Sequence, residues 1–560
     1  MNRDRMEHEH RDTSTTGVGT AKGQGATPAM SRRGPAVWPV HPFLFAAASV
    51  LALYTANLRE TSFGDVAPAL VTVVGSAALL VAAIALLLRD FGQRAAILAS
   101  IILVATLYHG GLFGRLSGLP GGSLPAAAAV PLTLVAVGVL AAVVMRARFD
   151  LAVPNALLNG IALVLVVTPV WTAASYTFET TALPRPALAA APTPAASTSL
   201  PQGAIAGPAV AATPDIYYFV FDRYGSQQTL ERVYGFDNRP FLESLRARGF
   251  YVASGSHANY PKTAPSFAST FDMDYLDLAA DPLARRNEWH PIYDKLENHR
   301  VGNFLKSKGY RFIQIGSWWA PTQHNAAADE NDSFGFSEFA WLYLRRTIVP
   351  KVVHAVAPGT RIAAMTDWDN GQCQRVPRQF AAVKAIGERP EATFTFVHVL
   401  LPHEPYVFAA DGRCLSPEEV RARGQKDGYL GQLRYANSLI ADTVDHLLAA
   451  PEKPIIILQA DEGPYPEAYR TGDRSWRQAT PEQLATKTAI LNAFHFPDGD
   501  YSTLYRDITS VNTFRLLFDK YFGTNHGRLP DRIFAFPNYS SIYDFFDVTE
   551  PARRGDGPAR

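Results

Sequence analysis

The sequence predicts an α/β protein in which a membrane region of five helices precedes a domain with a doubly wound, mostly parallel sheet. Near-continuous apolar runs fill the first third of the 560 residues, as is typical of membrane-spanning helices. Beyond residue 212, strand-like apolar segments alternate with helix-like segments. That order is typical of a sheet with helices on both faces.

The composition agrees with this division. Hydrophobic residues make up 48% of the chain and charged residues 18%, and the formal net charge is +1. A nearly neutral chain has no global basic field, so we expect no nucleic-acid partner. Residues 1–37 are rich in small polar residues and lack apolar periodicity, which predicts a disordered cytoplasmic tail.

The membrane region is expected over residues 38–177. Each of its five apolar runs is close to the roughly 20 residues that cross about 30 Å of hydrocarbon. A buried bundle in a soluble protein is the alternative, but runs without a polar face favour a membrane. The expected spans are Phe43–Leu58, Val66–Leu88, Ala95–Phe113, Pro125–Met145 and Val153–Tyr176.

Arginines in the loops predict the orientation. Six lie on the N-terminal side of the membrane and two on the other side, and basic loops stay in the cytoplasm. Five crossings then place everything after Tyr176 outside the cytoplasm. We therefore expect a multi-pass protein of the cytoplasmic (inner) membrane, with the lipid bilayer as a partner. The six are Arg32, Arg33, Arg89, Arg94, Arg146 and Arg148, and the two are Arg59 and Arg115.

An Ala- and Pro-rich linker is expected over residues 178–212, because dense proline favours an extended spacer. A globular domain is expected over residues 213–548 and a C-terminal tail over 549–560. Within the domain, Ile216–Phe221 is a continuous apolar run, typical of a strand that is buried on both faces. The other expected elements are a helix over Phe241–Arg248, a strand over Thr393–Leu401, a helix over Tyr435–Leu448 and a strand over Ile455–Leu458.

Polar residues lie just after three of these strands. Asp222 follows the first, His403 the second, and Asp461 and Glu462 the third. In such sheets functional groups collect beyond the carboxyl ends of the strands. Carboxylates from separate strands can hold a divalent cation, which promotes deprotonation of a hydroxyl and stabilises charge on a phosphoryl oxygen. Thr263 is the candidate hydroxyl nucleophile.

In this order the motifs resemble those of the alkaline phosphatase and sulfatase superfamily. The family's usual elements are an acidic residue after a strand, a nucleophile in a Cys/Ser/Thr-x-Pro-Ser setting and an Asp-His-Gly motif. The corresponding residues here are Asp222, Thr263-x-Pro265-Ser266 and Asp461-Glu462-Gly463, and the resemblance covers Pro214 to about Val548. Membrane spans before such a domain further resemble lipoteichoic-acid synthases and, more distantly, lipid A phosphoethanolamine transferases. The resemblance implies an alkaline phosphatase-like fold, with Thr263 as nucleophile and His403 at the substrate phosphate or leaving oxygen. The implied metal ligands are Asp222, Thr263, Asp461 and Glu462.

Two departures from the family pattern bear on the chemistry. The nucleophile position holds Thr263 rather than a Cys or Ser that can become formylglycine, and Phe267 stands where sulfatases have Arg. Sulfate-ester hydrolysis is therefore not expected. Glu462 replaces the usual His, and the resulting all-oxygen ligand set favours manganese or magnesium over zinc, which remains an option.

These observations predict an enzyme, a sulfatase-like transferase. It would move a phosphoryl-linked headgroup from a phospholipid donor to an envelope glycan or lipid acceptor, through a covalent intermediate on Thr263. Two alternatives stay open. A phosphoesterase would pass the same intermediate to water, and a catalytically silent domain would bind envelope polymer or scaffold a partner.

Each candidate residue also has a structural interpretation. Asp222 could cap a helix that begins near Ser226, and Ser266 could cap the helix that follows Thr263. His403 could be an ordinary loop histidine, and Asp461 to Pro464 an ordinary turn. Four unrelated turns would then have to reproduce one family order, which favours the metal site.

Three further features have weaker signals. Trp318 and Trp319, followed by His324 and Asp329, could line a pocket for a headgroup or glycan, although tryptophan pairs more often pack in a core. Lys262 could neutralise a phosphate. The two cysteines of the chain, Cys373 and Cys414, could pair outside the cytoplasm or remain reduced.

Overall fold

The computed structural model describes residues 38–112, 128–183, 214–472 and 474–557. The tail expected over residues 1–37 and most of the expected linker lie outside this part of the chain. Phe113, the last residue of the third expected span, and residues 125–127, the first of the fourth, lie outside it as well. Helix α6 continues to Thr181, a few residues into the region expected to be linker.

Five apolar helices occupy the described part of the N-terminal region. Three of them are long and apolar enough to cross a membrane: α2 (Phe63–Leu88), α5 (Ala129–Arg146) and α6 (Ala152–Thr181). The other two, α1 (His41–Ala56) and α3 (Gln93–Leu107), have 16 and 15 residues and are shorter than expected. The structure thus shows three helices of spanning length among the described residues, where the sequence predicted five.

The loop between α1 and α2 is tied to the C-terminal domain. The Leu58 carbonyl accepts a hydrogen bond from the His290 ring at 2.9 Å, and the Arg59 carbonyl accepts one from the Trp289 backbone N–H at 3.0 Å. The loop ends at Ser62, which forms a capping box with Asp65 at the start of α2. Residues of this loop therefore have a defined place beside the domain.

The domain is built on a seven-stranded sheet with the order β2-β7-β6-β1-β5-β3-β4. Neighbouring strands from β6 to β4 pair in parallel, and only β7 and β2 join as antiparallel strands. The predicted mostly parallel sheet is confirmed. The strands are β1 (Ile216–Phe221), β2 (Tyr251–Val252), β3 (Arg311–Ile315), β4 (Glu330–Asp332), β5 (Thr393–Val399), β6 (Ile455–Gln459) and β7 (Asn492–His495), with a separate pair β8 (Phe534–Ala535) and β9 (Phe546–Asp547).

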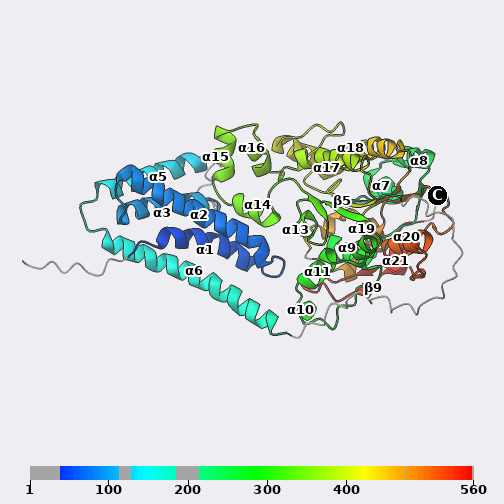
Figure 1. Cartoon of the computed structure of the whole chain (residues 1–560), viewed down its shortest axis with the longest axis horizontal. Helices are drawn as coiled ribbons and strands as arrows, with labels where there is room; N and C mark the ends of the chain where they lie inside the picture. The colour runs from blue at the N-terminus through cyan, green and yellow to red at the C-terminus, as the bar shows by residue number, and fades with distance from the viewer. Residues whose placement is uncertain (1–37, 113–127, 184–213, 473, 558–560) are drawn as a thin grey trace, which may run out of the picture. The chain divides into compact units, whose positions relative to one another are not determined.

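Helices cover both faces of this sheet, as Figure 1 shows for α17 and α18 on one side of β5 and α9 and α11 on the other. The helices are α7 (Gln227–Tyr234), α8 (Arg239–Ala247), α9 (Thr263–Asp272), α10 (Pro282–Arg285), α11 (His290–Glu297), α12 (Arg300–Ser307), α13 (Ala320–Gln323), α14 (Glu338–Leu344), α15 (Val349–Val356), α16 (Arg361–Thr366), α17 (Gln372–Ile386), α18 (Pro417–Leu448), α19 (Pro481–Thr488), α20 (Thr513–Phe522) and α21 (Thr549–Gly555).

Strand β1 divides two hydrophobic cores. Its residues Tyr217, Phe219 and Phe221 belong to the core under α17 and α18, whereas Ile216, Tyr218 and Val220 belong to the core under α9, α12 and α20. Successive side chains of a strand point to opposite faces, and a core covers each face of β1, so all six residues are buried. The continuous apolar run in the sequence is therefore explained by burial on both faces.

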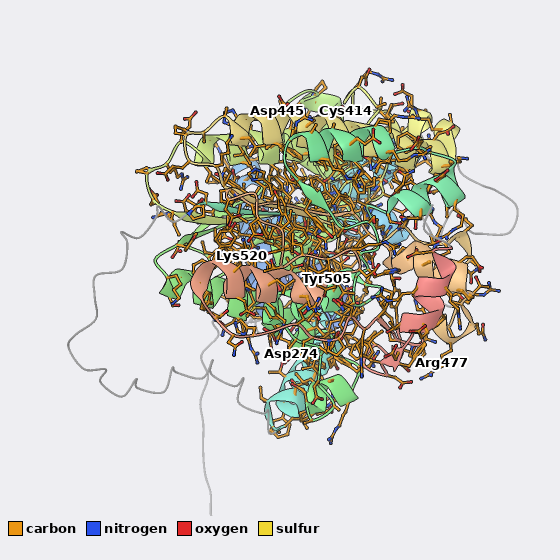
Figure 2. The ribbon with its side chains drawn as sticks, turned by 90° about the vertical axis from the view of Figure 1, so that its right-hand side faces the viewer. Asp274, Cys414, Asp445, Arg477, Tyr505 and Lys520 are labelled. Carbon is orange, nitrogen blue, oxygen red and sulfur yellow. A yellow bond between two sulfur atoms is a disulfide. The ribbon has the colours of Figure 1, made fainter. Side chains whose placement is uncertain are left out.

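Cys373 and Cys414 form a disulfide. Cys373 lies in the first turn of α17, and Cys414 precedes α18, on the side of the domain where Figure 2 labels it with Asp445. The bond closes a segment of the chain that contains His403.

The prediction of a C-terminal tail over residues 549–560 is wrong for the first part of that range. Residues Thr549–Gly555 form α21, and Ala552 is buried against the core that contains Val548. The next residue, Asp556, accepts a hydrogen bond from His257 at 2.8 Å. Glu550, Arg553 and Arg554 leave no apolar stripe in this segment of the sequence, which is why the helix was not predicted.

Candidate functional site

A strained turn at the end of β1 carries the first acidic residue. Asp222 follows the strand, and Arg223 then adopts the left-handed region at φ 64°, where a residue with a side chain pays a conformational cost. The Tyr429 hydroxyl stabilises the turn by donating to the Arg223 carbonyl at 2.9 Å and accepting from the Gly225 N–H at 3.2 Å. The turn fixes Asp222 and Arg223 in the site.

Thr263 is the first residue of α9, and Lys262 is its N-cap. The free backbone N–H groups and the dipole of a helix N-terminus favour negative charge, which suits an attacking oxygen or a phosphoryl group. Ser266 lies within the first turn, so its predicted alternative as the cap is wrong. The cap of α7 is Ser226, whose own side chain accepts from Thr229, so Asp222 does not fill that role.

Three buried carboxylates converge beside Thr263. Asp222, Asp461 and Glu462 each offer an oxygen, and these oxygens all lie within 4.8 Å of one another. One buried oxygen of each, namely Asp222 Oδ1, Asp461 Oδ2 and Glu462 Oε2, has no hydrogen-bond partner among the described residues. Buried polar atoms without partners are rare in folded proteins. These residues therefore fit a divalent cation, which would take up the unpaired oxygens.

The electrostatics of this cluster agree with that role. Burial raises the pKa of Asp222 to about 7, and the charge of Glu462 adds to the effect while that of Arg223 opposes it. Burial also raises the pKa of Asp461 to about 8, with further contributions from Asp222 and Glu462 and a lowering by the nearby Thr263 hydroxyl. Like charges this close repel one another unless a cation compensates them.

A pH dependence of stability follows from these raised pKa values. Between about pH 4 and about pH 8, the metal-free folded protein holds protons on Asp222 and Asp461 that the unfolded chain has released. Its stability should therefore fall as the pH rises through this window. Melting temperatures measured with a chelator and with manganese should diverge as the pH rises. If manganese raised the melting temperature by the same amount at about pH 4 and at about pH 8, this expectation would be contradicted.

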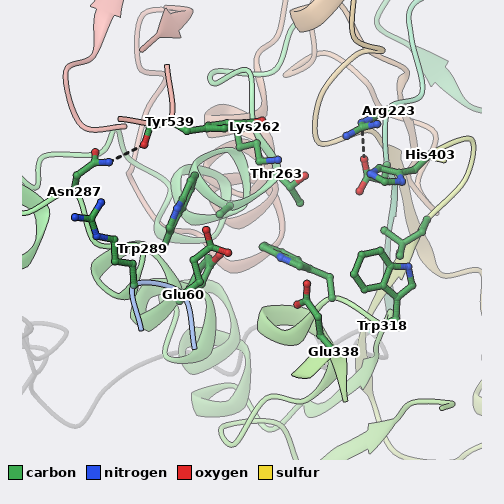
Figure 3. A pocket seen from close by; sticks show the side chains of 16 residues that line it. Glu60, Arg223, Lys262, Thr263, Asn287, Trp289, Trp318, Glu338, His403 and Tyr539 are labelled. Carbon is green, nitrogen blue, oxygen red and sulfur yellow. Dashed lines mark hydrogen bonds and ion pairs between the residues drawn. The ribbon is translucent and has the colours of Figure 1, made fainter. Parts of the chain in front are cut away.

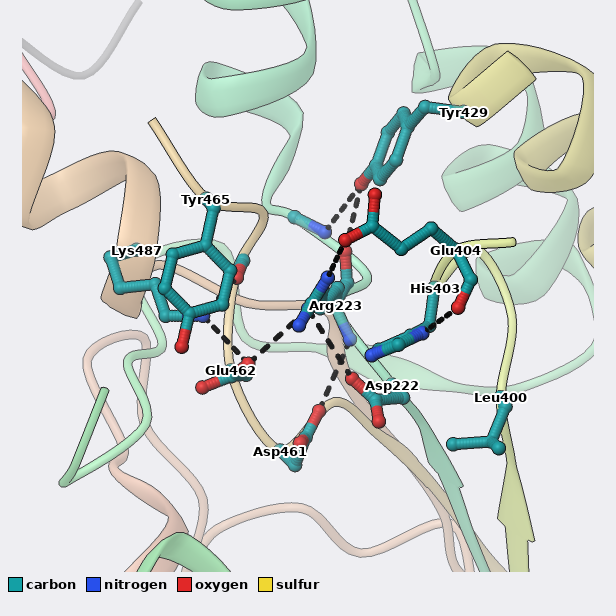
Figure 4. A network of polar contacts seen from close by, with 12 residues as sticks. Asp222, Arg223, Leu400, His403, Glu404, Tyr429, Asp461, Glu462, Tyr465 and Lys487 are labelled. Carbon is teal, nitrogen blue, oxygen red and sulfur yellow. Dashed lines mark hydrogen bonds and ion pairs between the residues drawn. The ribbon is translucent and has the colours of Figure 1, made fainter. Parts of the chain in front are cut away.

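Cationic side chains that the sequence did not single out balance part of the charge. Lys487 Nζ lies 2.6 Å from Glu462 Oε1, and both side chains are fully buried. Arg223 Nε lies 3.4 Å from the same oxygen, and Arg223 also pairs with Glu404 at 3.3 Å. The ring of Tyr465 lies against both cations. Figure 4 shows the three carboxylates gathered around Arg223.

Two histidines lie close to the carboxylates. His403 lines the same cavity as Thr263, and its Nδ1 bonds to the Glu404 carbonyl. Burial and the charge of Arg223 hold the pKa of His403 well below its usual value, so its imidazole is neutral. His398, which the sequence reasoning missed, is fully buried in β5, with Nε2 3.7 Å from Asp222 Oδ2 and Nδ1 2.8 Å from Thr322 Oγ1.

A cavity of about 380 Å³ opens over Thr263. Figure 3 shows Lys262, Thr263 and Arg223 on one side of it, opposite Glu60 and Glu338. Trp318 and Trp319 line it, in agreement with the pocket considered for this pair, whereas Asp329 instead pairs with Lys306 at 2.9 Å. The lining residues are Arg59, Glu60, Asp222, Arg223, Lys262, Thr263, Ala264, Asn287, Trp289, Tyr293, Trp318, Trp319, Glu338, Leu400, His403 and Tyr539.

The missed residues differ in how visible they are in the sequence. Arg223 and Glu404 directly follow the candidates Asp222 and His403, so adjacency to a predicted strand end was an available signal. Lys487 has no comparable signal, because it approaches Glu462 only through the fold of α19. Glu60 lies in the loop between two apolar helices, and sequence position alone does not connect that loop with Thr263.

Comparison with known proteins identifies a family for this domain. Residues 222–516 match the family model described as "Sulfatase". The C-terminal periplasmic domain of EcEptC from Escherichia coli is 14% identical, with 61% of this chain and 94% of that chain covered and a TM-score of 0.38. The corresponding domain of the phosphoethanolamine transferase EptC from Campylobacter jejuni is 11% identical (56% and 90% covered, TM-score 0.34). A phosphonate monoester hydrolase of Agrobacterium radiobacter is 13% identical (58% and 80% covered, TM-score 0.35). No curated protein matches the chain.

Proposed function

Because the chain belongs to the sulfatase family, we propose that it is a membrane-bound, metal-dependent transferase. It moves a phosphoryl-linked headgroup from a phospholipid donor to an envelope glycan or lipid, through a covalent intermediate on Thr263. The proposed topology places α2, α5 and α6, which are of spanning length, and the shorter α1 and α3 across the cytoplasmic membrane. The N-terminus then lies in the cytoplasm and the sheet domain outside. The Cys373–Cys414 disulfide supports that side, since disulfides persist in oxidising compartments.

The cavity over Thr263 is the observation that carries this proposal. Its walls include Arg59 and Glu60, from the loop between two apolar helices, as well as Thr263 and Asp222 from the sheet domain. A donor that is held in the membrane by its acyl chains can thus present its phosphoryl group to Thr263. A site made for a water-soluble ester would have no need of a wall from the membrane region.

Each residue of the site has a role in the proposed reaction. Asp222, Asp461 and Glu462, with the Thr263 hydroxyl, would hold a divalent cation, which when bound favours the deprotonated hydroxyl and offsets charge on the phosphoryl group. The α9 N-terminus and Lys262 orient the phosphoryl group for attack by Thr263 Oγ. The bond from phosphorus to the glyceride oxygen breaks as the bond to Thr263 Oγ forms, and the proton from the Thr263 hydroxyl ends on the glyceride oxygen, which leaves as diacylglycerol. The acceptor hydroxyl then attacks the phosphorus, the bond to Thr263 Oγ breaks, and the acceptor's proton returns to Thr263 Oγ. His403, whose imidazole is neutral, contacts the substrate phosphate or the leaving oxygen.

Oxygen ligands favour manganese or magnesium as the cation. The imidazole of His398, 3.7 Å from Asp222, keeps zinc as a competitor, because imidazole suits zinc.

Product analysis tests transfer directly. The full chain, reconstituted in vesicles with a phospholipid labelled in its headgroup and supplied with manganese and an envelope acceptor fraction, should move the label to the acceptor and release diacylglycerol. Label that appears only as a water-soluble phosphate ester would identify the phosphoesterase alternative. No release of label, in a preparation that binds metal, would identify the silent domain.

A further inference from the structure

A segment of the sheet domain packs directly on the apolar helices. Phe339 and Tyr343 of α14 share a hydrophobic core with residues of α1 and α2, including Val50 and Leu53. The Tyr343 hydroxyl also lies 2.6 Å from Ser49 Oγ. Ser49 is seven residues before the end of α1 at Ala56, or about 10 Å along the helix at 1.5 Å per residue. Helix α14 therefore reaches below the outer end of α1.

The chain then turns at the outer end of α3. The Ile348 N–H donates to the Thr106 carbonyl at 3.0 Å, and the Gly110 N–H donates to the Arg346 carbonyl at 2.8 Å. Lys351 Nζ lies 3.1 Å from the His109 ring. Thr106 is the penultimate residue of α3, which ends at Leu107. Helix α15 thus starts at the level where the membrane helices end.

The two helices that follow, α15 and α16, with their connection, form a hairpin over residues 349–366. In the described part of the chain none of the eight residues of α15 is buried, although four of them are valines. Val352, Val356 and Ile362 are 42%, 74% and 59% exposed. Valine is a poor helix former, and clustered exposed apolar residues mark an interaction surface.

The charged residues within this hairpin are basic, and Asp367, the residue that follows it, lies with Oδ1 4.0 Å from His354 Nε2. Arg345, Arg346, Lys351 and Arg361 lie in or beside it, and residues 339–366 contain neither Asp nor Glu. Apolar side chains flanked by basic ones are typical of helices that lie in the interface of a bilayer, and basic residues there attract anionic headgroups.

We propose that this hairpin, residues 349–366, lies in the headgroup layer of the outer leaflet and binds anionic lipid. The exposed apolar side chains of the hairpin continue the surface on which α14 and Ile348 contact the membrane helices. Because those helices lie in the bilayer, the same bilayer is what covers the hairpin. The proposal rests on the proposed membrane topology and is independent of the transfer reaction. Glu338, the first residue of α14, lines the cavity over Thr263, so the hairpin holds the cavity next to the lipid surface.

Site-directed spin labelling of the full chain tests this placement. Val356→Cys and Ile362→Cys, each reconstituted in phosphatidylcholine vesicles with phosphatidylglycerol, carry the label at the introduced thiol, because the native cysteines form a disulfide. The matched control is Val233→Cys on α7, where the native valine is 43% exposed. Power saturation compares collisions with oxygen, which concentrates in lipid, and with a water-soluble nickel chelate.

Both hairpin labels should collide more with oxygen than with the chelate, and the control label should do the opposite. Labels at 356 and 362 that behave like the control would overturn the proposal. Vesicles without phosphatidylglycerol should give smaller oxygen preferences, and equal values would overturn the preference for anionic lipid. Inserted labels in a protein that transfers no headgroup would leave the docking intact and reject the proposed function instead.

Discussion

The Thr263→Ala variant should lose at least about a thousandfold in kcat, because removal of a catalytic nucleophile leaves only binding and electrostatic contributions to the rate. Thr263 stands at the N-terminus of α9 and lines the cavity together with Asp222 and His403. Alanine keeps the helix start and removes the attacking oxygen. KM for the lipid donor should change little, since the cavity walls remain. Rates with labelled phospholipid in vesicles measure both parameters.

Two variants control for structural effects of this change. Thr263→Ser keeps the hydroxyl and should retain part of the activity. Ser266→Ala removes a buried hydroxyl from the first turn of the same helix and should leave the rate close to that of the native protein. Full turnover by Thr263→Ala, with a normal melting temperature, would remove Thr263 from the role of nucleophile.

Asp461→Asn should weaken binding of manganese by on the order of a hundredfold or more, since an amide oxygen replaces a charged ligand and second-shell changes alone cost 10- to 100-fold. Activity should fall in parallel at low metal concentration. Without metal, the variant should be more stable than the native protein at pH 7, because burial raises the pKa of Asp461 to about 8, so the native carboxyl must take up a proton on folding at that pH, whereas the amide need not. Calorimetric titration and chelator-treated melting curves measure the two effects.

Glu404→Gln is the matched control. Glu404 lies near the site and pairs with Arg223 and Arg470, but it does not belong to the converging set of carboxylates. Its affinity for manganese should stay near the native value. Equal metal affinity of Asp461→Asn and the native protein would mean that the carboxylate cluster does not hold the ion.

The elements that the sequence predicted correctly depend on local patterns. The apolar run of β1 is visible because both faces of the strand are buried, and Asp222 is visible because it ends that run. Thr263 and the Asp461-Glu462 pair were found through the order of family motifs rather than through local physics. The structure brings these residues together, and the unpaired carboxylate oxygens support the metal site.

Features that depend on distant contacts could not be predicted. Lys487 reaches Glu462 from α19, and nothing in its own surroundings marks it as buried. Glu60 joins the cavity because the Leu58 and Arg59 carbonyls bond to α11 and its cap. Strands β6 and β7 pair in antiparallel fashion, but no short hairpin turn connects them, so the sequence contains no local pattern that predicts this pairing. In each case tertiary packing determines where the residue or strand lies, and no hydrophobic periodicity in the sequence predicts it.

Mass spectrometry of the protein after incubation with a headgroup-labelled phospholipid, without acceptor, tests the central claim most directly. The full chain in vesicles with manganese should carry the labelled phosphoryl group on the peptide that contains Thr263, and addition of acceptor should discharge it. Diacylglycerol should appear in equal amount. Turnover of the lipid with no modification of Thr263, or with the label on another residue such as Ser266, would contradict the covalent mechanism.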